Sequence, residues 1–268
     1  MKQLIATAAA AAALAAPAAP SLAADSPFEF TANVGLFSQY LFRSIRQTGG
    51  NPAVQGGFDF AHSSGLYAGT WASNVSWLQD FDLYTRSSLE WDFYGGFKRN
   101  IGDTDFYFDI GTIYYWYPGT KNPGVVSADT WEGYLGLGWK WLGVKYSYSF
   151  TDYFGARPTG QKTDGSWYLD FFVNFPVGET GLTLKAHYGI LDVKRDGNRA
   201  DATEASYNDW LLGVAYTVPS GFFKNTELGA YYADNNVKNG DAGTNFYTTP
   251  AGYNTAKDSF VVYVKKTF

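Results

Sequence analysis

Charged side chains recur at every second position in this chain, and that spacing suggests what chemistry they could do. Glu90 and Asp92 alternate with Trp91 and Phe93. Successive side chains of an extended chain point to opposite faces, so the carboxylates share one face and the aromatic rings the other. Carboxylates beside ammonium groups on a wet face can bind or select polar solutes. The pattern favours binding or passage of solutes over covalent catalysis.

The same alternation places further polar residues on the face that holds Glu90. We expect the residues that line it to be Arg43, Gln55, Asp59, Glu90, Asp92, Lys98, Asp109, Glu132, Lys140, Lys145, Asp170, Lys185, Glu227 and Lys265. Two interpretations stay open for the carboxylates. They could give a preference for cations, or they could pair with the lysines in a network that partly plugs the interior.

Arg43 and Arg46 form a second candidate site close to Gln47, Gln55 and Asp59. One hypothesis is a cationic patch at a pore mouth that selects anionic solutes, since rings of arginine favour anions. The alternative is that Arg43 pairs with Asp59 or another carboxylate of the polar face and fixes the local hairpin.

Tyrosines on the polar face also allow two interpretations. They could stack against sugars or aromatic solutes, or they could simply fill the interior. The residues concerned are Tyr94, Tyr134, Tyr168, Tyr231 and Tyr263.

Extended segments of about ten residues must position these side chains. Alternation predicts twelve strands near 30–42, 53–61, 67–71, 89–98, 106–116, 131–140, 144–150, 168–175, 182–190, 209–217, 227–232 and 258–268. The gaps between them switch between long and short. An even number of strands with short turns at one end and long loops at the other is typical of a single-chain outer-membrane barrel. The predicted fold is therefore an all-β transmembrane antiparallel barrel with short periplasmic turns and long extracellular loops.

The bulky face is expected to point outward into lipid. A closed barrel of twelve strands is wider than an eight-stranded barrel, whose interior is just filled by side chains. The side chains of one face could therefore not fill the wider interior without leaving voids. Tyr114, Trp116, Trp131, Trp210 and Tyr216 lie near strand ends, as in the aromatic girdles of membrane barrels. The longest loop, 235–257, is expected to narrow the outer mouth.

Composition limits the remaining classes. Residues 1–24 combine Lys2 with an alanine-rich stretch and small residues before Asp25, which predicts a signal peptide ahead of a barrel over 25–268. The chain has no Cys, so disulfides and thiolate metal sites are excluded. The formal net charge of −5 argues against nucleic acid as a partner. We expect no cofactor and no metal.

Enzymatic activity is not indicated. The chain has 2 His, and neither His62 nor His187 accompanies a G-x-S-x-G motif. The acidic loop that contains Asp192, Asp196 and Asp201 is interpreted as solvated rather than as a calcium site.

Two stretches resemble known signals. The final strand, which ends at Phe268, resembles the signal by which outer-membrane barrels are recognised by their assembly machinery. Residues 33–77 resemble the opening of the TorF-type family of porins, on the strength of Tyr40-x-Phe42-Arg43, Gln47-Thr48, the segment 52–59 (PAVQGGFD) and the segment 69–74 (GTWASN). The resemblance implies an exported, barrel-forming protein.

The sequence therefore predicts a porin or channel in the outer membrane of a Gram-negative bacterium. Small hydrophilic solutes would diffuse through a polar, mixed-charge lumen, and outer-membrane lipid and the assembly machinery would be its partners. The alternative is a structural barrel that conducts nothing and presents its loops to binding partners.

Overall fold

The computed structural model describes residues 26–157, 160–194, 204–240 and 243–268. The predicted signal peptide lies outside these residues. The elements are β1 (Phe28–Phe37), β2 (Leu41–Phe42), β3 (Ile45–Arg46), β4 (Ala53–His62), β5 (Leu66–Asn74), α1 (Trp77–Asp80), β6 (Tyr84–Arg86), β7 (Leu89–Asn100), β8 (Phe106–Trp116), β9 (Thr120–Lys121), β10 (Thr130–Trp139), β11 (Leu142–Ser149), η1 (Tyr153–Gly155), β12 (Trp167–Pro176), β13 (Leu182–Asp192), β14 (Tyr207–Thr217), β15 (Thr226–Asn235) and β16 (Ser259–Thr267).

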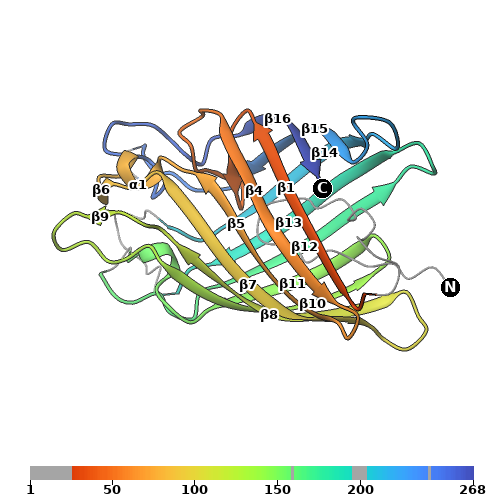
Figure 1. Ribbon diagram of the computed structural model, residues 1–268. Coiled ribbons are helices and arrows are strands. Elements are labelled where there is room, and N and C mark those ends of the chain that lie inside the picture. Colours follow the sequence, from red (N-terminus) through yellow and green to blue (C-terminus); the bar gives the residue numbers. More distant parts are fainter. Residues whose placement is uncertain (1–25, 158–159, 195–203, 241–242) are drawn as a thin grey trace.

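Twelve of these strands form one closed antiparallel barrel, as the alternation predicts. Its order is β1-β16-β15-β14-β13-β12-β11-β10-β8-β7-β5-β4, and β1 closes it by pairing with both β16 and β4. Figure 1 shows the strands crossing the barrel obliquely. Closure pairs every strand on both sides, so the barrel has no free edge.

The two ends of the barrel differ in the length of their connections. Short turns, such as 63–65 and 140–141, join strands at one end, which we call the turn end. At the other, the loop end, the connections are 38–52, 75–88, 117–129, 150–166, 193–206 and 236–258, and the described parts carry α1, β6, β9 and η1. In Figure 1, α1, β6 and β9 lie together at the loop end.

The outer face of the barrel is apolar. Phe30, Leu36, Phe58, Leu212 and Phe260 are each more than half exposed. Many further aromatic and aliphatic side chains of the strands share this exposure, while their sequence neighbours are largely buried inside. A continuous apolar belt around a closed barrel is the surface that lipid requires. Within the described part of the chain, no helix is both long and apolar enough to cross a membrane.

The first predicted strand is shorter than expected. β1 ends at Phe37, and residues 41–46 form the small hairpin β2–β3. We call Leu41–Arg46 the inner hairpin. Arg43 and Ser44 form its turn and both have positive φ, 48° and 59°, as a two-residue turn of type I′ requires. The sequence prediction missed this hairpin because it assigned Leu41 and Phe42 to the first strand.

Candidate functional site

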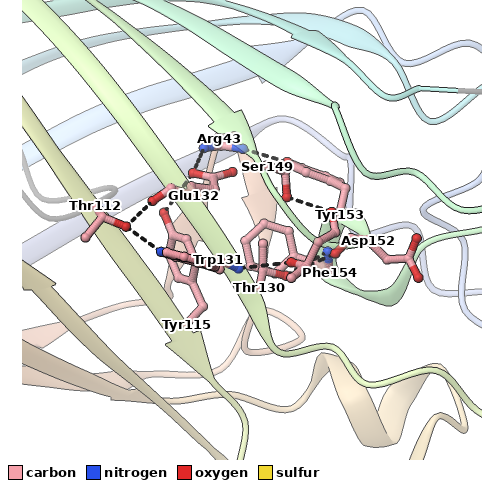
Figure 2. Close-up of polar contacts among 11 residues, drawn as sticks. Arg43, Thr112, Tyr115, Thr130, Trp131, Glu132, Ser149, Asp152, Tyr153 and Phe154 are labelled. Carbon is pink, nitrogen blue, oxygen red and sulfur yellow. Dashed lines mark hydrogen bonds and ion pairs between the residues drawn. The ribbon is translucent and has the colours of Figure 1, made fainter.

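The inner hairpin contacts opposite walls of the barrel interior. On one side, Nη2 of Arg43 donates to Oε2 of Glu132 on β10 at 2.8 Å, and Nη1 donates to the hydroxyl of Tyr153 at 3.1 Å. Figure 2 shows Arg43 reaching Glu132 and Tyr153. The Arg43 and Glu132 side chains are only 6% and 3% exposed, so this ion pair is buried.

The other side of the hairpin turn binds β14 and β15. Oγ of Ser44 donates to Oδ2 of Asp209 at 2.8 Å, and the hydroxyl of Tyr207 donates to the carbonyl oxygen of Arg43 at 2.7 Å. Nδ2 of Asn235 donates to the carbonyl oxygen of Ser44 at 3.3 Å. Because β10 and β14 are separated by three strands of the barrel order, the hairpin bridges the interior.

Apolar packing holds the hairpin in this position. Tyr40 and Phe42 belong to a buried cluster with Trp71, Ile45 packs with Tyr153 and Tyr207 in a second, and Leu41 packs with Tyr231 and Val261 in a third. The connection between the first two predicted strands, 30–42 and 53–61, therefore begins inside the barrel. A single short segment supplies side chains to all three clusters, so the interior at the loop end is packed.

Carboxylates gather in the same part of the interior. We call Glu90, Asp92, Glu132 and Asp209, together with Arg43, the outer layer; the four carboxylates lie near the loop ends of β7, β10 and β14. Each carboxylate residue is at most 2% exposed. Oε1 and Oε2 of Glu90 accept hydrogen bonds from the hydroxyls of Tyr40 and Tyr117 at 2.8 and 2.9 Å. Within the described structure, neither carboxylate oxygen of Asp92 has a hydrogen-bond partner.

The Arg43 guanidinium is held by aromatic faces as well as by charge. Its Cζ lies 4.3 Å from the ring centroid of Tyr168, 4.7 Å from that of Phe42 and 5.5 Å from that of Tyr153. Burial lowers the pKa of this guanidinium, but the charges of Glu132, Tyr153 and Tyr115 and the hydrogen bond to Glu132 together raise the pKa well above its ordinary value. Arg43 is therefore a fixed positive charge.

Lysines gather at the turn end. We call Lys98, Lys145, Lys185 and Lys265 the lysine ring; they lie near the turn ends of β7, β11, β13 and β16. Nζ of Lys185 lies 2.9 Å from Oε1 of Glu227, which also accepts from the hydroxyl of Tyr263 at 2.6 Å. Lys98 and Lys145 lie over the rings of Tyr107 and Tyr134, at 4.5 and 5.3 Å. Among the described residues, Lys98, Lys145 and Lys265 have no carboxylate within 4.0 Å.

Tyrosines cross inward-facing glycines to reach carboxylates on neighbouring strands. Gly189 pairs with both Asp170 on β12 and Asp209 on β14, and the hydroxyl of Tyr168 passes beside it to donate to Oδ1 of Asp209 at 3.0 Å. A Cβ on Gly189 would lie 2.0 Å from that hydroxyl. Tyr94 similarly lies over Gly69 and donates to Asp59 at 2.5 Å. The interior glycines thus make room for these bonds.

Tyr67 binds a further carboxylate, and Tyr134 contacts Tyr67. The hydroxyl of Tyr67 donates to Oδ1 of Asp109 at 2.6 Å and also contacts the hydroxyl of Tyr134. Tyr67, Tyr94 and Tyr168 thus donate hydrogen bonds to interior carboxylates. In this arrangement their rings fill space in the barrel interior.

The structure places most of the predicted site residues on the inner face. Gln55, Asp59, Asp109 and Asp170 lie on interior positions of β4, β8 and β12. The prediction for Lys140 is wrong. β10 ends at Trp139, and Lys140 takes a left-handed turn conformation at φ 50°, with a side chain 47% exposed and 3.3 Å from Asp105.

The two arginines have separate partners, and Arg43 pairs with a carboxylate of the polar face, which is one of the two expectations for it. Arg43 pairs with Glu132 and not with Asp59, which accepts from Tyr94. Arg46 is not part of a patch with Arg43, since it donates to the hydroxyls of Ser259 and Tyr253 at 2.8 Å. Glu132 lies far from Arg43 in the sequence, so spacing could not identify the pair. The available signal was the apolar run Leu41–Phe42 at the end of the predicted first strand, followed by the apolar Ile45 in the polar gap.

The first loop, rather than the last, crosses the interior. Described residues of the last loop pack on the inner hairpin, with Ala256 in the cluster of Ile45 and Tyr247 beside it. The backbone N–H of Arg46 donates to the carbonyl oxygen of Thr255 at 2.9 Å. The last loop therefore supports the hairpin from outside.

His187 is bound between carboxylates of the interior. Its Nδ1 lies 3.2 Å from Oδ1 of Asp170, and its Nε2 lies 3.1 Å from Oδ2 of Asp209. No group of three His, Cys, Asp or Glu residues in the described ranges is arranged to hold a metal ion. Asp196 and Asp201 of the acidic loop lie outside the described residues.

A closed barrel with an apolar exterior and a charged interior defines a porin-like architecture, and comparison with known proteins agrees. The family model for bacterial proteins of unknown function (Gcw_chp) matches residues 21–268, so the chain belongs to the Gcw_chp family. The TorF-type resemblance stays a prediction. No curated protein sequence matches this chain.

Solved structures match the barrel over nearly its whole length. The KdgM porin aligns with a TM-score of 0.52 at 8% identity, covering 89% of this chain and 99% of that chain. The NanC porin aligns with a TM-score of 0.51 at 13% identity, covering 88% and 98%. A KdgM porin in complex with disordered oligogalacturonate aligns with a TM-score of 0.51 at 8% identity, covering 89% and 99%. At these identities the likeness establishes the fold.

Proposed function

We propose that this protein is a porin-type channel of the outer membrane of Gram-negative bacteria, which passes small hydrophilic solutes through its charged interior. The observation that carries the proposal is the inversion of the barrel. Side chains of the apolar belt, such as Phe58 and Leu212, are exposed, while charged side chains such as Glu132 and Lys185 point inward. A soluble barrel would bury the apolar face, since water favours the opposite arrangement.

The narrowest level of the proposed channel is the outer layer. The inner hairpin crosses it, and Glu90, Asp92 and Asp209 are at most 1% exposed there. Polar side chains that can exchange partners line this level, so a solute's hydration can be replaced as it passes. In this conformation the hairpin restricts the path of solutes at the loop end. The lysine ring lines that path at the turn end.

The same packing supports a second candidate, a barrel that conducts nothing and uses its loops to bind partners. The fully buried outer layer favours it. Single-channel conductance of the refolded chain in a planar bilayer separates the two. We expect discrete steps from the folded chain and none from heat-denatured chain. A folded barrel without steps would contradict the channel and favour the interaction barrel.

We also propose that the last strand directs assembly. β16 presents Phe260 and Val262 outward, and Phe268 is 65% exposed beyond its end, which leaves the terminal ring accessible to the assembly machinery. Deletion of Phe268 should lower the amount of folded barrel in outer-membrane fractions while leaving refolding in detergent intact. Equal amounts of folded barrel with and without Phe268 would contradict an assembly role.

A further inference from the structure

The surroundings of Arg43 have the composition of a binding site for organic cations. A buried carboxylate, Glu132, faces the guanidinium at 2.8 Å, and three aromatic rings lie within 5.5 Å of its Cζ. Aromatic faces attract cations most strongly where water is excluded, and a planar guanidinium matches the geometry of a carboxylate. These groups would hold a free guanidinium for the same reasons that they hold Arg43.

The outer layer has more negative than positive charge. Four carboxylates, Glu90, Asp92, Glu132 and Asp209, share it with Arg43, and among the described residues the one other basic group in contact is His187 beside Asp209. Asp92 is 0% exposed, and within the described structure both its oxygens lack a hydrogen bond. A buried carboxylate without a partner is costly, so a further cation at Asp92 would stabilise the layer.

Resting on the proposed channel, we propose that the outer layer is a binding site for solutes with a guanidinium or primary ammonium group, and that Arg43 occupies it as a tethered competitor. Among the described residues, no group of three His, Cys, Asp or Glu residues is arranged to hold a metal ion, which favours a larger cation with spread charge. A solute cation that takes over Glu132 and the rings of Tyr153 and Tyr168 would release the inner hairpin and clear the interior.

The backbone of the hairpin makes such release less costly. Arg43 and Ser44 both have positive φ without being glycine, and residues other than glycine are strained in this conformation. The contacts of Arg43 and Ser44 offset this strain while the hairpin bridges the barrel. Replacing the Arg43 contacts with those of a solute relieves it.

Calorimetric titration of the refolded chain in detergent micelles tests the proposal without depending on conductance. The probe is ethylguanidinium chloride, and ethylurea is its neutral counterpart of the same shape. We expect binding of ethylguanidinium and none of ethylurea. Equal heats from the two probes, or none from ethylguanidinium, would overturn the inference even if the barrel conducts. If the barrel binds ethylguanidinium but does not conduct, the proposed binding site would stand and only the proposed channel would be contradicted.

Three variants distinguish a site from a structural cluster. Asp92→Asn should weaken ethylguanidinium binding about tenfold, which corresponds to about 1.4 kcal/mol, whereas Asp105→Asn in the exposed β7–β8 turn should leave it unchanged. Arg43→Gln should tighten binding, because it removes the competitor. If Asp92→Asn binds as well as the parent chain, or a folded Arg43→Gln variant binds more weakly, the proposal fails. Asp92→Asn keeps the test valid where Arg43→Gln does not fold.

Discussion

The two ends of the barrel interior hold opposite charges in different environments. In the outer layer, carboxylates are packed and Arg43 is their main counter-charge. In the lysine ring, Lys98, Lys145 and Lys265 are half-buried, Lys98 and Lys145 lie over tyrosine rings, and Lys185 is buried against Glu227. The same alternation of side chains places charges at both ends of the interior, since Asp92 and Lys98 lie on one face of β7. The difference arises because the inner hairpin covers only the loop end. The inner hairpin thus buries the charges at the loop end, whereas at the turn end the Lys185–Glu227 pair is buried without it.

The largest expected contrast is in stability. Arg43→Ala leaves Glu132 buried without its partner, and loss of one member of a buried ion pair costs about 3–5 kcal/mol. Lys98→Ala removes a partly exposed charge, for which we expect less than about 1 kcal/mol. Urea unfolding of both variants in detergent micelles measures the difference. Equal losses would mean that the two ends do not differ as described.

Glycine substitutions sharpen the comparison between the two ends. Gly189→Ala would place a Cβ 2.0 Å from the hydroxyl of Tyr168 and 2.3 Å from Oδ1 of Asp209, whereas the nearest atom to a Cβ on Gly136 is 3.4 Å away. We expect Gly189→Ala to destabilise the barrel by about 1–3 kcal/mol through overpacking. Gly136→Ala is the matched control and should change the unfolding midpoint little. A neutral Gly189→Ala would show that Tyr168 does not need this space.

The apolar belt lies between the two ends of the barrel, and a substitution there should have an effect of intermediate size. Leu212 lies midway along β14 and is 59% exposed. Leu212→Lys should cost about 2–4 kcal/mol when the barrel is folded in lipid, as expected for lysine near the bilayer midplane. Unfolding in phospholipid vesicles measures this cost, and Leu212→Ala controls for lost side-chain volume. A cost that is the same for both substitutions would contradict a lipid-facing Leu212.

The smallest effect concerns selectivity at the turn end. Replacing Lys98 and Lys145 with Gln removes two positive charges from the lysine ring, so the ratio of anion to cation permeability should fall. We expect a change of less than about fivefold, because accessible charges contribute under about 1 kcal/mol. The reversal potential in a salt gradient reports it. An unchanged potential would exclude these lysines from the path of ions.

Strand positions and the direction of each face could be predicted from the sequence, because a period of two is a local property. Trp91 and Phe93 lie outside and Glu90 and Asp92 inside, as the alternation indicates. The inner hairpin could not be predicted in this way. Its position depends on Glu132, Tyr153 and Asp209, which lie far along the chain, and on packing against three clusters.

Turn geometry limited the prediction for Lys140. The alternation through Trp139 continues into Lys140 in the sequence, but the chain reverses there and the side chain turns outward. The glycines between tyrosines and carboxylates were visible in the sequence as small inward residues. Their role required the register, which brings Tyr168, Gly189 and Asp209 together across three strands.

One measurement tests most directly whether the outer layer is the narrowest level of a channel. It compares the single-channel conductance of the parent chain with that of the double variant Arg43→Gln with Glu132→Gln. The variant removes the ion pair without leaving a buried charge unpaired and keeps groups that can hydrogen-bond. We expect larger conductance steps from the variant. Identical steps from two folded barrels would contradict the assignment of the narrowest level, and no steps from either would contradict the channel itself.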